Sequence, residues 1–237
     1  MDDDRADQVA AVAALAEPTR RRLYDHVARR AHPVGRDEAA EALGLPRATA
    51  AFHLDRLVAD GLLDVHYERR TGRTGPGAGR PSKLYRRSDR PVTVSLPERS
   101  YDLAGDLLAA ALTEAEASGR PPREVLGRRA FERGQELGAA VDRTEVRGRD
   151  AALRVLEENG FEPRAEDDGI TLVNCPFHRL ARTHTELVCG MNLRLIDGVL
   201  DGIPGAGLAA SLRPTPGLCC VRLDEAPTTR TESAGAR

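Results

Sequence analysis

The sequence predicts an α+β fold divided into two parts near residue 90. Residues 17–60 contain three short helical patterns separated by breaks, and residues 62–87 contain two β-prone segments around a glycine-rich, basic stretch. Residues 101–225 then alternate helical and β-prone patterns. Hydrophobic residues make up 41% of the chain but aromatic residues only 3%, so the core must consist mainly of Leu, Val and Ala.

The charge is unevenly distributed between the two parts. Residues 18–90 carry 16 Lys and Arg residues against 9 Asp and Glu residues, whereas residues 91–237 carry 18 against 23. A basic block beside an acidic block indicates that only the first part meets a polyanion. Residues 1–10 are acidic, and we expect them to form a disordered tail.

The chain shows no sign of a membrane or secreted location. Its start, MDDDRADQ, lacks the apolar region of a signal peptide, and no run approaches the roughly 20 apolar residues of a membrane helix. We therefore expect a cytoplasmic protein with no membrane partner. Its four cysteines would then be reduced, which favours metal, cluster or redox roles over structural disulfides.

Residues 11–90 are predicted to begin with helices at 17–30, 37–43 and 47–60. Pro18 suits a first helical turn, and the sequence Gly-Leu-Pro at 44–46 makes a tight break. A short helix, a glycine-containing turn and a longer helix are the helix-turn-helix arrangement, whose second helix enters the major groove of DNA. The residues expected to face DNA from this helix are Arg47, Thr49, Ala50, His53 and Arg56.

Two strands are predicted at 62–68 and 82–87, on either side of the sequence RRTGRTGPGAGRP. Such a pair with a basic tip forms the wing of a winged helix-turn-helix domain, and we expect Arg73, Arg80 and Lys83 to contact DNA. The segment GPGAG does not predict a phosphate-binding loop, because it lacks the required glycine spacing and precedes a proline and a strand. A solvated basic face is the plainer alternative for the whole region.

The sequences EPTRRRLYDHV, AFHLDRLVADGLLDVHYERRTGR and GRPSKLYRRS together resemble the winged-helix domain of ArsR-type bacterial repressors over residues 10–90. The resemblance implies that helix 47–60 reads DNA and that the protein regulates transcription, as a repressor, from an operator in double-stranded DNA. Because regulators of this kind read paired half-sites, we expect a homodimer.

Residues 91–225 are predicted to form a helical segment and a small α+β domain for effector binding and dimerisation. We expect helices at 101–119, 122–141 and 149–160, a hairpin at 161–177, a helix capped by Thr183 and Glu186, and a strand at 217–225. The apolar stripe of the first helix, from Leu103 to Leu112, fits either a core position or a dimer seam. Residues 226–237 are expected to be a disordered tail.

All four cysteines lie in this second part. Cys175 is predicted at the end of a strand, Cys189 in a helix, and Cys219 and Cys220 in a late strand, where neighbours point to opposite faces. Three cysteines from three segments could therefore meet, and His178 follows Cys175 at a plausible ligand spacing. Thiolates favour zinc or an iron–sulfur cluster. Burial in the core and a thiol redox switch are the alternatives.

The sequence NCPFHRLARTHTELVCGMN followed by PGLCCVRL resembles a group of bacterial regulators that includes the repressor of the Suf iron–sulfur assembly operon. The resemblance implies that Cys175, Cys189 and one of Cys219 and Cys220 hold an iron–sulfur cluster that controls DNA binding. Zinc, or no metal and an organic ligand, are the alternatives. An enzyme with Cys175 as nucleophile is a poorer hypothesis beside a DNA-binding domain, and we expect no enzymatic activity.

Overall fold

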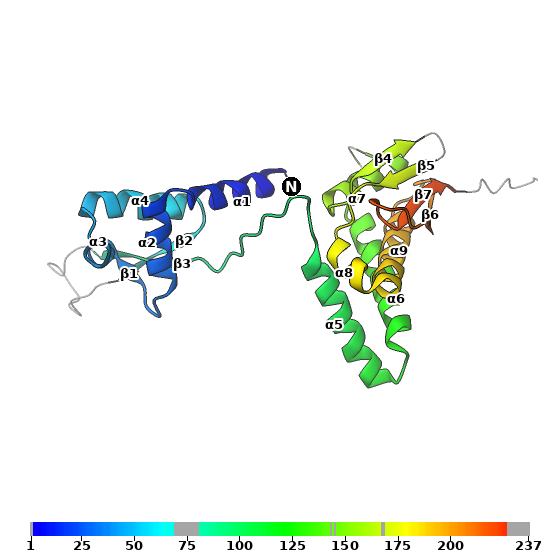
Figure 1. Cartoon of the computed structure of the whole chain (residues 1–237), viewed down its shortest axis with the longest axis horizontal. Helices are drawn as coiled ribbons and strands as arrows, with labels where there is room; N and C mark the ends of the chain where they lie inside the picture. Colours follow the sequence, from blue (N-terminus) through cyan, green and yellow to red (C-terminus); the bar gives the residue numbers. More distant parts are fainter. Residues whose placement is uncertain (1, 69–80, 143, 145, 167–168, 227–237) are drawn as a thin grey trace, which may run out of the picture. The chain divides into compact units, whose positions relative to one another are not determined.

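The computed structural model describes residues 2–68, 81–142, 144, 146–166 and 169–226. The chain divides into two compact units, Met1–Val94 and Ser95–Arg237, and each is described by itself (Figure 1). The predicted wing tip, with Arg73 and Arg80, lies outside the described residues, and so does the predicted tail at 226–237 apart from residue 226.

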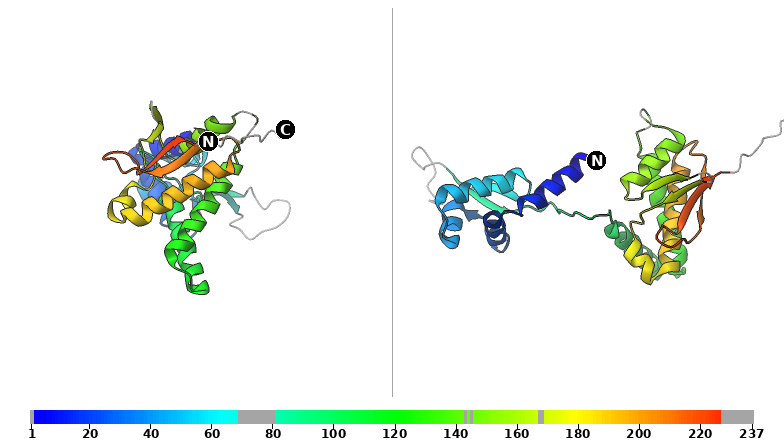
Figure 2. Two further views of the ribbon diagram at one scale, coloured as in Figure 1. Left: turned by 90° about the vertical axis from the view of Figure 1, so that its right-hand side faces the viewer. Right: turned by 45° about the horizontal axis from the view of Figure 1, so that its top comes forward.

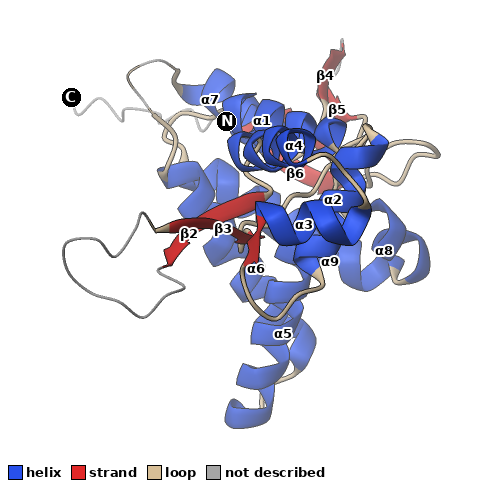
Figure 3. Ribbon diagram, turned by 90° about the vertical axis from the view of Figure 1, so that its left-hand side faces the viewer, coloured by secondary structure: helices blue, strands red, loops and turns tan. Residues whose placement is uncertain are grey.

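The first unit is a helical layer on a small antiparallel sheet. Its helices are α1 (Asp2–Ala14), α2 (Pro18–Ala28), α3 (Arg36–Leu43) and α4 (Arg47–Ala59). Its strands are β1 (Val34–Gly35), β2 (Leu63–Glu68) and β3 (Ser82–Arg87), in the order β1-β3-β2 (Figure 3). β2 and β3 pair in the register Leu63↔Arg87 to Glu68↔Ser82, which makes the two arms of the wing.

The prediction of a disordered tail at 1–10 is wrong for residues 2–10, because they belong to α1. The acidic start led to that expectation, but the segment continues into an alanine-rich run with high helix propensity. Ala11 and Ala14 are buried in the core of the first unit, and this packing stabilises the end of the helix.

Local signals set the helix-turn-helix. Glu17 caps α2 by accepting hydrogen bonds from the backbone N–H groups of Thr19 and Arg20. Gly44 ends α3 in the left-handed region at φ +64°, which a glycine adopts without strain. Pro46 then directly precedes α4, as the sequence predicted.

The second unit packs five helices around one apolar core and one sheet. The helices are α5 (Tyr101–Ser118), α6 (Pro122–Ala139), α7 (Gly148–Glu158), α8 (His178–Thr183) and α9 (Thr185–Gly202), within the described part of the chain. The strands are β4 (Pro163–Glu166), β5 (Gly169–Leu172), β6 (Leu208–Leu212) and β7 (Val221–Glu225). They form an antiparallel sheet in the order β4-β5-β7-β6. Figure 2 shows the strands of this sheet, coloured yellow-green and orange to red, from two further sides.

Two local predictions for this unit are wrong, and one strand was not predicted. Thr183 ends α8 instead of capping the next helix, and α9 begins at Thr185 after His184. The sequence did not reveal β6, which pairs with β7 from Leu208 to Leu212. Finally, β7 begins only at Val221, so Cys219 and Cys220 precede the strand. The turn at Gly217, with φ +82°, delays the strand.

α6 and α9 cross at four glycines. A Cβ atom on Gly134 would collide with the backbone of α9 near Leu195, and a Cβ atom on Gly198 would collide with the backbone of α6 at Phe131. Gly138 and Gly202 lie one turn further along the same crossing. The two backbones therefore approach more closely than any larger residues would allow, and this contact fixes the position of α9 in the unit.

Within the described ranges, every helix falls short of the combined length and hydropathy that a membrane span needs.

Candidate DNA-reading surface and cysteine centre

α4 is the second helix of the helix-turn-helix, and its inner face is filled by apolar side chains. Ala50, Leu54 and Leu57 are all fully buried. The prediction that Ala50 faces DNA is therefore wrong: residue 50 lies four positions before Leu54, on the same side of the helix. The opposite side exposes Ala48, Phe52 and Arg56.

The other predicted contacts of α4 differ in their exposure. The side chain of His53 is only 13% exposed, and its Nδ1 atom lies 3.7 Å from Oε2 of Glu17, the residue that caps α2. His53 therefore points towards α2, which corrects the expectation that it faces outwards. Thr49 is half-buried.

Arg47 and Arg56 have exposed guanidinium groups at the two ends of α4. Arg47 forms an ion pair with Asp37 of α3, and Nη2 of Arg56 lies 3.0 Å from Oδ1 of Asp60. Their side chains remain 62% and 55% exposed. The pair of Arg47 with Asp37 is exposed on both sides, so Arg47 can exchange its carboxylate for phosphate at small cost. The Asp60 side chain that Arg56 contacts is only 7% exposed, so releasing Arg56 from it costs more.

Asp55 joins α4 to the wing. Its Oδ1 atom lies 2.5 Å from Nζ of Lys83 and accepts a hydrogen bond of 2.7 Å from the hydroxyl of Tyr85. Burial raises the pKa of Asp55, but the hydrogen bonds from Lys83 and Tyr85 outweigh it and hold the pKa below its ordinary value of 3.8. The predicted DNA contact Lys83 is thus engaged within the unit. This link could not be predicted from the sequence, because Asp55 and Tyr85 are 30 residues apart.

The link between Asp55 and the wing should stabilise the first unit in a pH-dependent way. We expect Asp55→Ala to lower the free energy of unfolding by about 1 kcal/mol at pH 7. Since the folded-state pKa is lowered, this contribution is fully present above pH 3.8 and is lost as the pH falls through the folded-state value. Denaturant unfolding at pH 7 and pH 3 measures it. Asp64→Ala is the control, because its contact with Arg86 is long, at 3.7 Å.

The four cysteines come together in the second unit. Cys175 follows β5, Cys189 lies in α9, and Cys219 and Cys220 precede β7. Cys189 Sγ donates to Cys220 Sγ at 2.7 Å, and Cys219 donates to Cys175. The expectation that only one of the adjacent cysteines faces the centre is therefore wrong. The alternation of a strand does not apply to them, because both lie in the turn before Val221.

The thiols of this cysteine centre differ in how readily they ionise. The hydrogen bond from Cys219 lowers the pKa of Cys175 to about 7, with a further contribution from the positive charge of Arg99. The same hydrogen bond and burial raise the pKa of Cys219. Burial, followed by the contact with Cys220, raises the pKa of Cys189. Of Cys175, Cys189 and Cys219, Cys175 therefore ionises most easily to a thiolate, because its pKa alone is lowered.

Asn192 is a component of the cysteine centre that sequence reasoning missed. Its side chain is 1% exposed, and its Nδ2 group donates to Cys219 Sγ at 3.3 Å. Its Oδ1 atom has no hydrogen-bond partner among the described residues. An amide on the otherwise apolar face of α9 was the available signal.

His178 is not brought to the cysteines as the prediction of a ligand required. Only its backbone approaches, with the N–H group donating to the carbonyl of Cys175 at 3.0 Å, while the residue is exposed at the start of α8. Among the residues that the structure describes, no three Cys, His, Asp or Glu side chains are arranged to hold a single metal ion. The observed arrangement is two thiol pairs, Cys175–Cys219 and Cys189–Cys220.

Comparison with protein families identifies the first unit. The family model of a helix-turn-helix domain matches residues 15–66, which run from the cap of α2 into β2. The chain thus carries a helix-turn-helix DNA-binding domain, and it is a transcriptional regulator. The comparisons with curated proteins and with solved structures each found no match.

Proposed function

We propose that the cysteine centre is the sensor of this regulator and that an iron–sulfur cluster is what it binds. The observation that carries the proposal is the convergence of four thiols from three separate segments of the second unit. A set made only of thiols matches the ligands that iron–sulfur clusters take from proteins. It does not suit calcium or magnesium, which prefer oxygen ligands.

The residues that would hold the cluster are Cys175, Cys189, Cys219 and Cys220. When bound, a cluster would supply an oxidation-sensitive link among the three segments that carry these cysteines. Each cysteine binds iron as a thiolate, so both S–H···S contacts must be given up on binding. Arg99 and Asn192 suit this state, because a nearby positive charge and an N–H donor both stabilise thiolate sulfur. A single zinc ion would need at least three of these thiols around it, an arrangement that the described residues do not show.

A thiol redox switch is the second candidate, favoured by the contact between Cys189 and Cys220. Their sulfur atoms are 2.7 Å apart, so a disulfide needs little movement of the backbone. Its formation removes two protons and two electrons from the thiols, which hydrogen peroxide accepts as it becomes two water molecules. The same oxidation would be prevented while a cluster occupies the thiolates.

An organic effector is the third candidate, and an open groove between α6 and α9 is where it would bind. The groove has a volume of about 570 Å³. Its apolar lining includes Phe131, Leu187 and Met191, and the guanidinium of Arg194 lies 4.7 Å from the centre of the Phe131 ring. An apolar floor beside an arginine fits a small apolar carboxylate.

We further propose that the regulator binds a double-stranded DNA operator as a homodimer and represses transcription from it. α5 supports the dimer, because it carries apolar side chains on two sides. Leu107 and Ala111 are buried within the unit, whereas Leu112 is 55% exposed and Tyr101 is 36% exposed on the outer side. A second copy of α5 would cover this outer side, and paired half-sites require two copies. Sedimentation of the full chain tests the dimer.

The test of the sensor is iron, sulfide and zinc analysis of the full chain purified without oxygen, together with its absorption spectrum. Iron and sulfide in equal amounts with broad visible absorption support the cluster. Zinc without iron assigns the centre to zinc. A metal-free protein whose DNA affinity changes with hydrogen peroxide contradicts the cluster and supports the disulfide.

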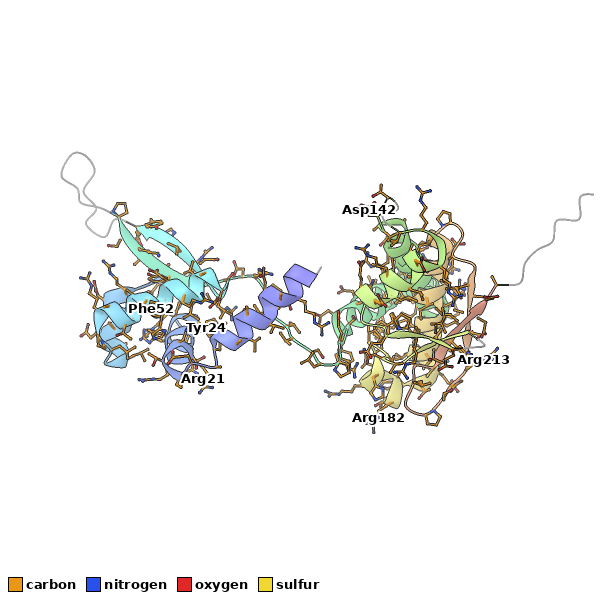
Figure 4. The ribbon with its side chains drawn as sticks, turned by 90° about the horizontal axis from the view of Figure 1, so that it is seen from above. Arg21, Tyr24, Phe52, Asp142, Arg182 and Arg213 are labelled. Carbon is orange, nitrogen blue, oxygen red and sulfur yellow. The ribbon has the colours of Figure 1, made fainter. Side chains whose placement is uncertain are left out.

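The arginines of α4 should contribute to DNA affinity without sequence preference. We expect Arg47→Ala and Arg56→Ala each to weaken binding to all DNA sequences and to reduce the slope of log K against log salt by about 1, because one phosphate contact is lost. Titrations of the full chain at several salt concentrations measure this slope. Arg21→Ala, on the surface of α2 (Figure 4), is the control. Unchanged slopes in both variants would contradict a role for α4 in DNA binding.

A further inference from the structure

Phe52 is the most exposed large apolar side chain of α4. It is 66% exposed, whereas the apolar residues of the inner face of the helix are fully buried. Burial of so large an apolar side chain is favourable, and within the first unit Phe52 stays mostly unburied. Ala48, one turn earlier, is also exposed. Phe52 and Ala48 therefore make an apolar strip on the helix that carries the exposed Arg47 and Arg56.

The phenylalanine ring is held in place by its neighbour. The rings of Phe52 and His53 lie 5.3 Å apart at 69°, an edge-to-face contact. The side chain of His53 is largely buried, and its Nδ1 atom lies 3.7 Å from Oε2 of Glu17. Phe52, labelled in Figure 4, is thus presented from a rigid helix rather than from a loop. A side chain oriented in this way contributes to recognition with little loss of conformational entropy.

We propose that Phe52, assisted by Ala48, reads thymine in the operator through the 5-methyl group of the base. The proposal rests on the DNA-binding function of the helix-turn-helix. The thymine methyl group is the apolar feature that base pairs present in the major groove, and phenylalanine and alanine side chains contact it. The exposed guanidinium groups of Arg47 and Arg56, at the two ends of α4, can contact backbone phosphates and so position Phe52 over a base pair.

The test begins by selecting bound sequences from a random double-stranded DNA library with the full chain and with Phe52→Ala. The wild type should require thymine at one position in each half-site, and the variant should accept any base there. Deoxyuridine, which lacks only the methyl group, then replaces that thymine. We expect the wild type to lose about fourfold in affinity per half-site, which corresponds to about 0.8 kcal/mol for one buried carbon. The variant should bind both DNAs equally.

Val12→Ala is the matched control, since Val12 is an exposed apolar residue of α1, at 48%. It should select the same sequences as the wild type and keep the full effect of deoxyuridine. Phe52→Ala removes an exposed side chain, so it should fold normally. If the variant loses affinity equally for thymine and deoxyuridine DNA, or selects the wild-type sequences, Phe52 does not read thymine. If the wild type selects no sequence at all, operator recognition itself is contradicted.

Discussion

Replacing Gly198 by alanine is expected to destabilise the second unit by about 3 kcal/mol, the upper end of the range for overpacking. The added Cβ atom would meet the carbonyl oxygen of Phe131, and a backbone cannot give way as a flexible side chain can. The two helices would have to separate along the whole crossing. Because α9 also carries Cys189 and Asn192, separation of the two helices should displace these residues from the other three cysteines of the centre.

Gly190 and Gly105 provide matched controls for this substitution. A Cβ atom on either would meet no atom within 4 Å, so alanine fits there. Since alanine favours a helix more than glycine, both variants should be more stable than the wild type by about 0.5–1 kcal/mol. Hydrogen exchange measured on peptides can follow each unit separately. Gly198→Ala should lower protection in α6 and α9 and leave α2 to α4 unchanged; normal protection in α6 would show that the crossing is not tight.

Short-range signals in the sequence predicted most of the first unit. The family match over residues 15–66 agrees with the helix-turn-helix that the breaks at Gly44 and Pro46 predicted. The exposed face of α4 was harder to predict. Ala50 is small enough to suit either side, so only its packing with Leu54 and Leu57 settles that it lies inside. The exposed Phe52 was missed for a different reason: a phenylalanine is ordinarily expected in the core.

The second unit depended more on contacts between distant residues. The helices α5 to α7 follow apolar periodicity and were predicted, whereas β6 exists only because β7 pairs with it. The sequence predicted that the cysteines lie in separate segments. It could not predict that Cys219 and Cys220 both turn inwards, since this depends on where β7 begins. The glycine crossing of α6 and α9 is also set by tertiary packing. The four-residue spacing of its glycines in each helix is visible in the sequence, but it does not say which two helices meet.

The effects of substituting single cysteines should separate the two chemistries proposed for the centre. If a cluster is bound, we expect Cys175→Ser and Cys189→Ser each to lower the iron content of anaerobically purified protein at least tenfold. If the signal is instead a disulfide between Cys189 and Cys220, Cys175→Ser should keep its response to hydrogen peroxide. Cys189→Ser should then lose that response, because one of the two sulfurs is gone.

His178→Ala is the control, because the structure leaves this residue exposed at the start of α8. It should keep both the iron and the response. DNA affinity measured with and without oxygen reports the response, and iron analysis reports whether the cluster is bound. A variant that loses the iron but keeps the response, or the reverse, separates cluster binding from sensing. Loss of iron in both cysteine variants with unchanged regulation would make the cluster structural rather than sensory. Retention of iron and of the response in both variants would contradict a sensory role for the cysteines and leave packing as their role, since Cys175, Cys189 and Cys219 are buried and Cys220 is half-buried.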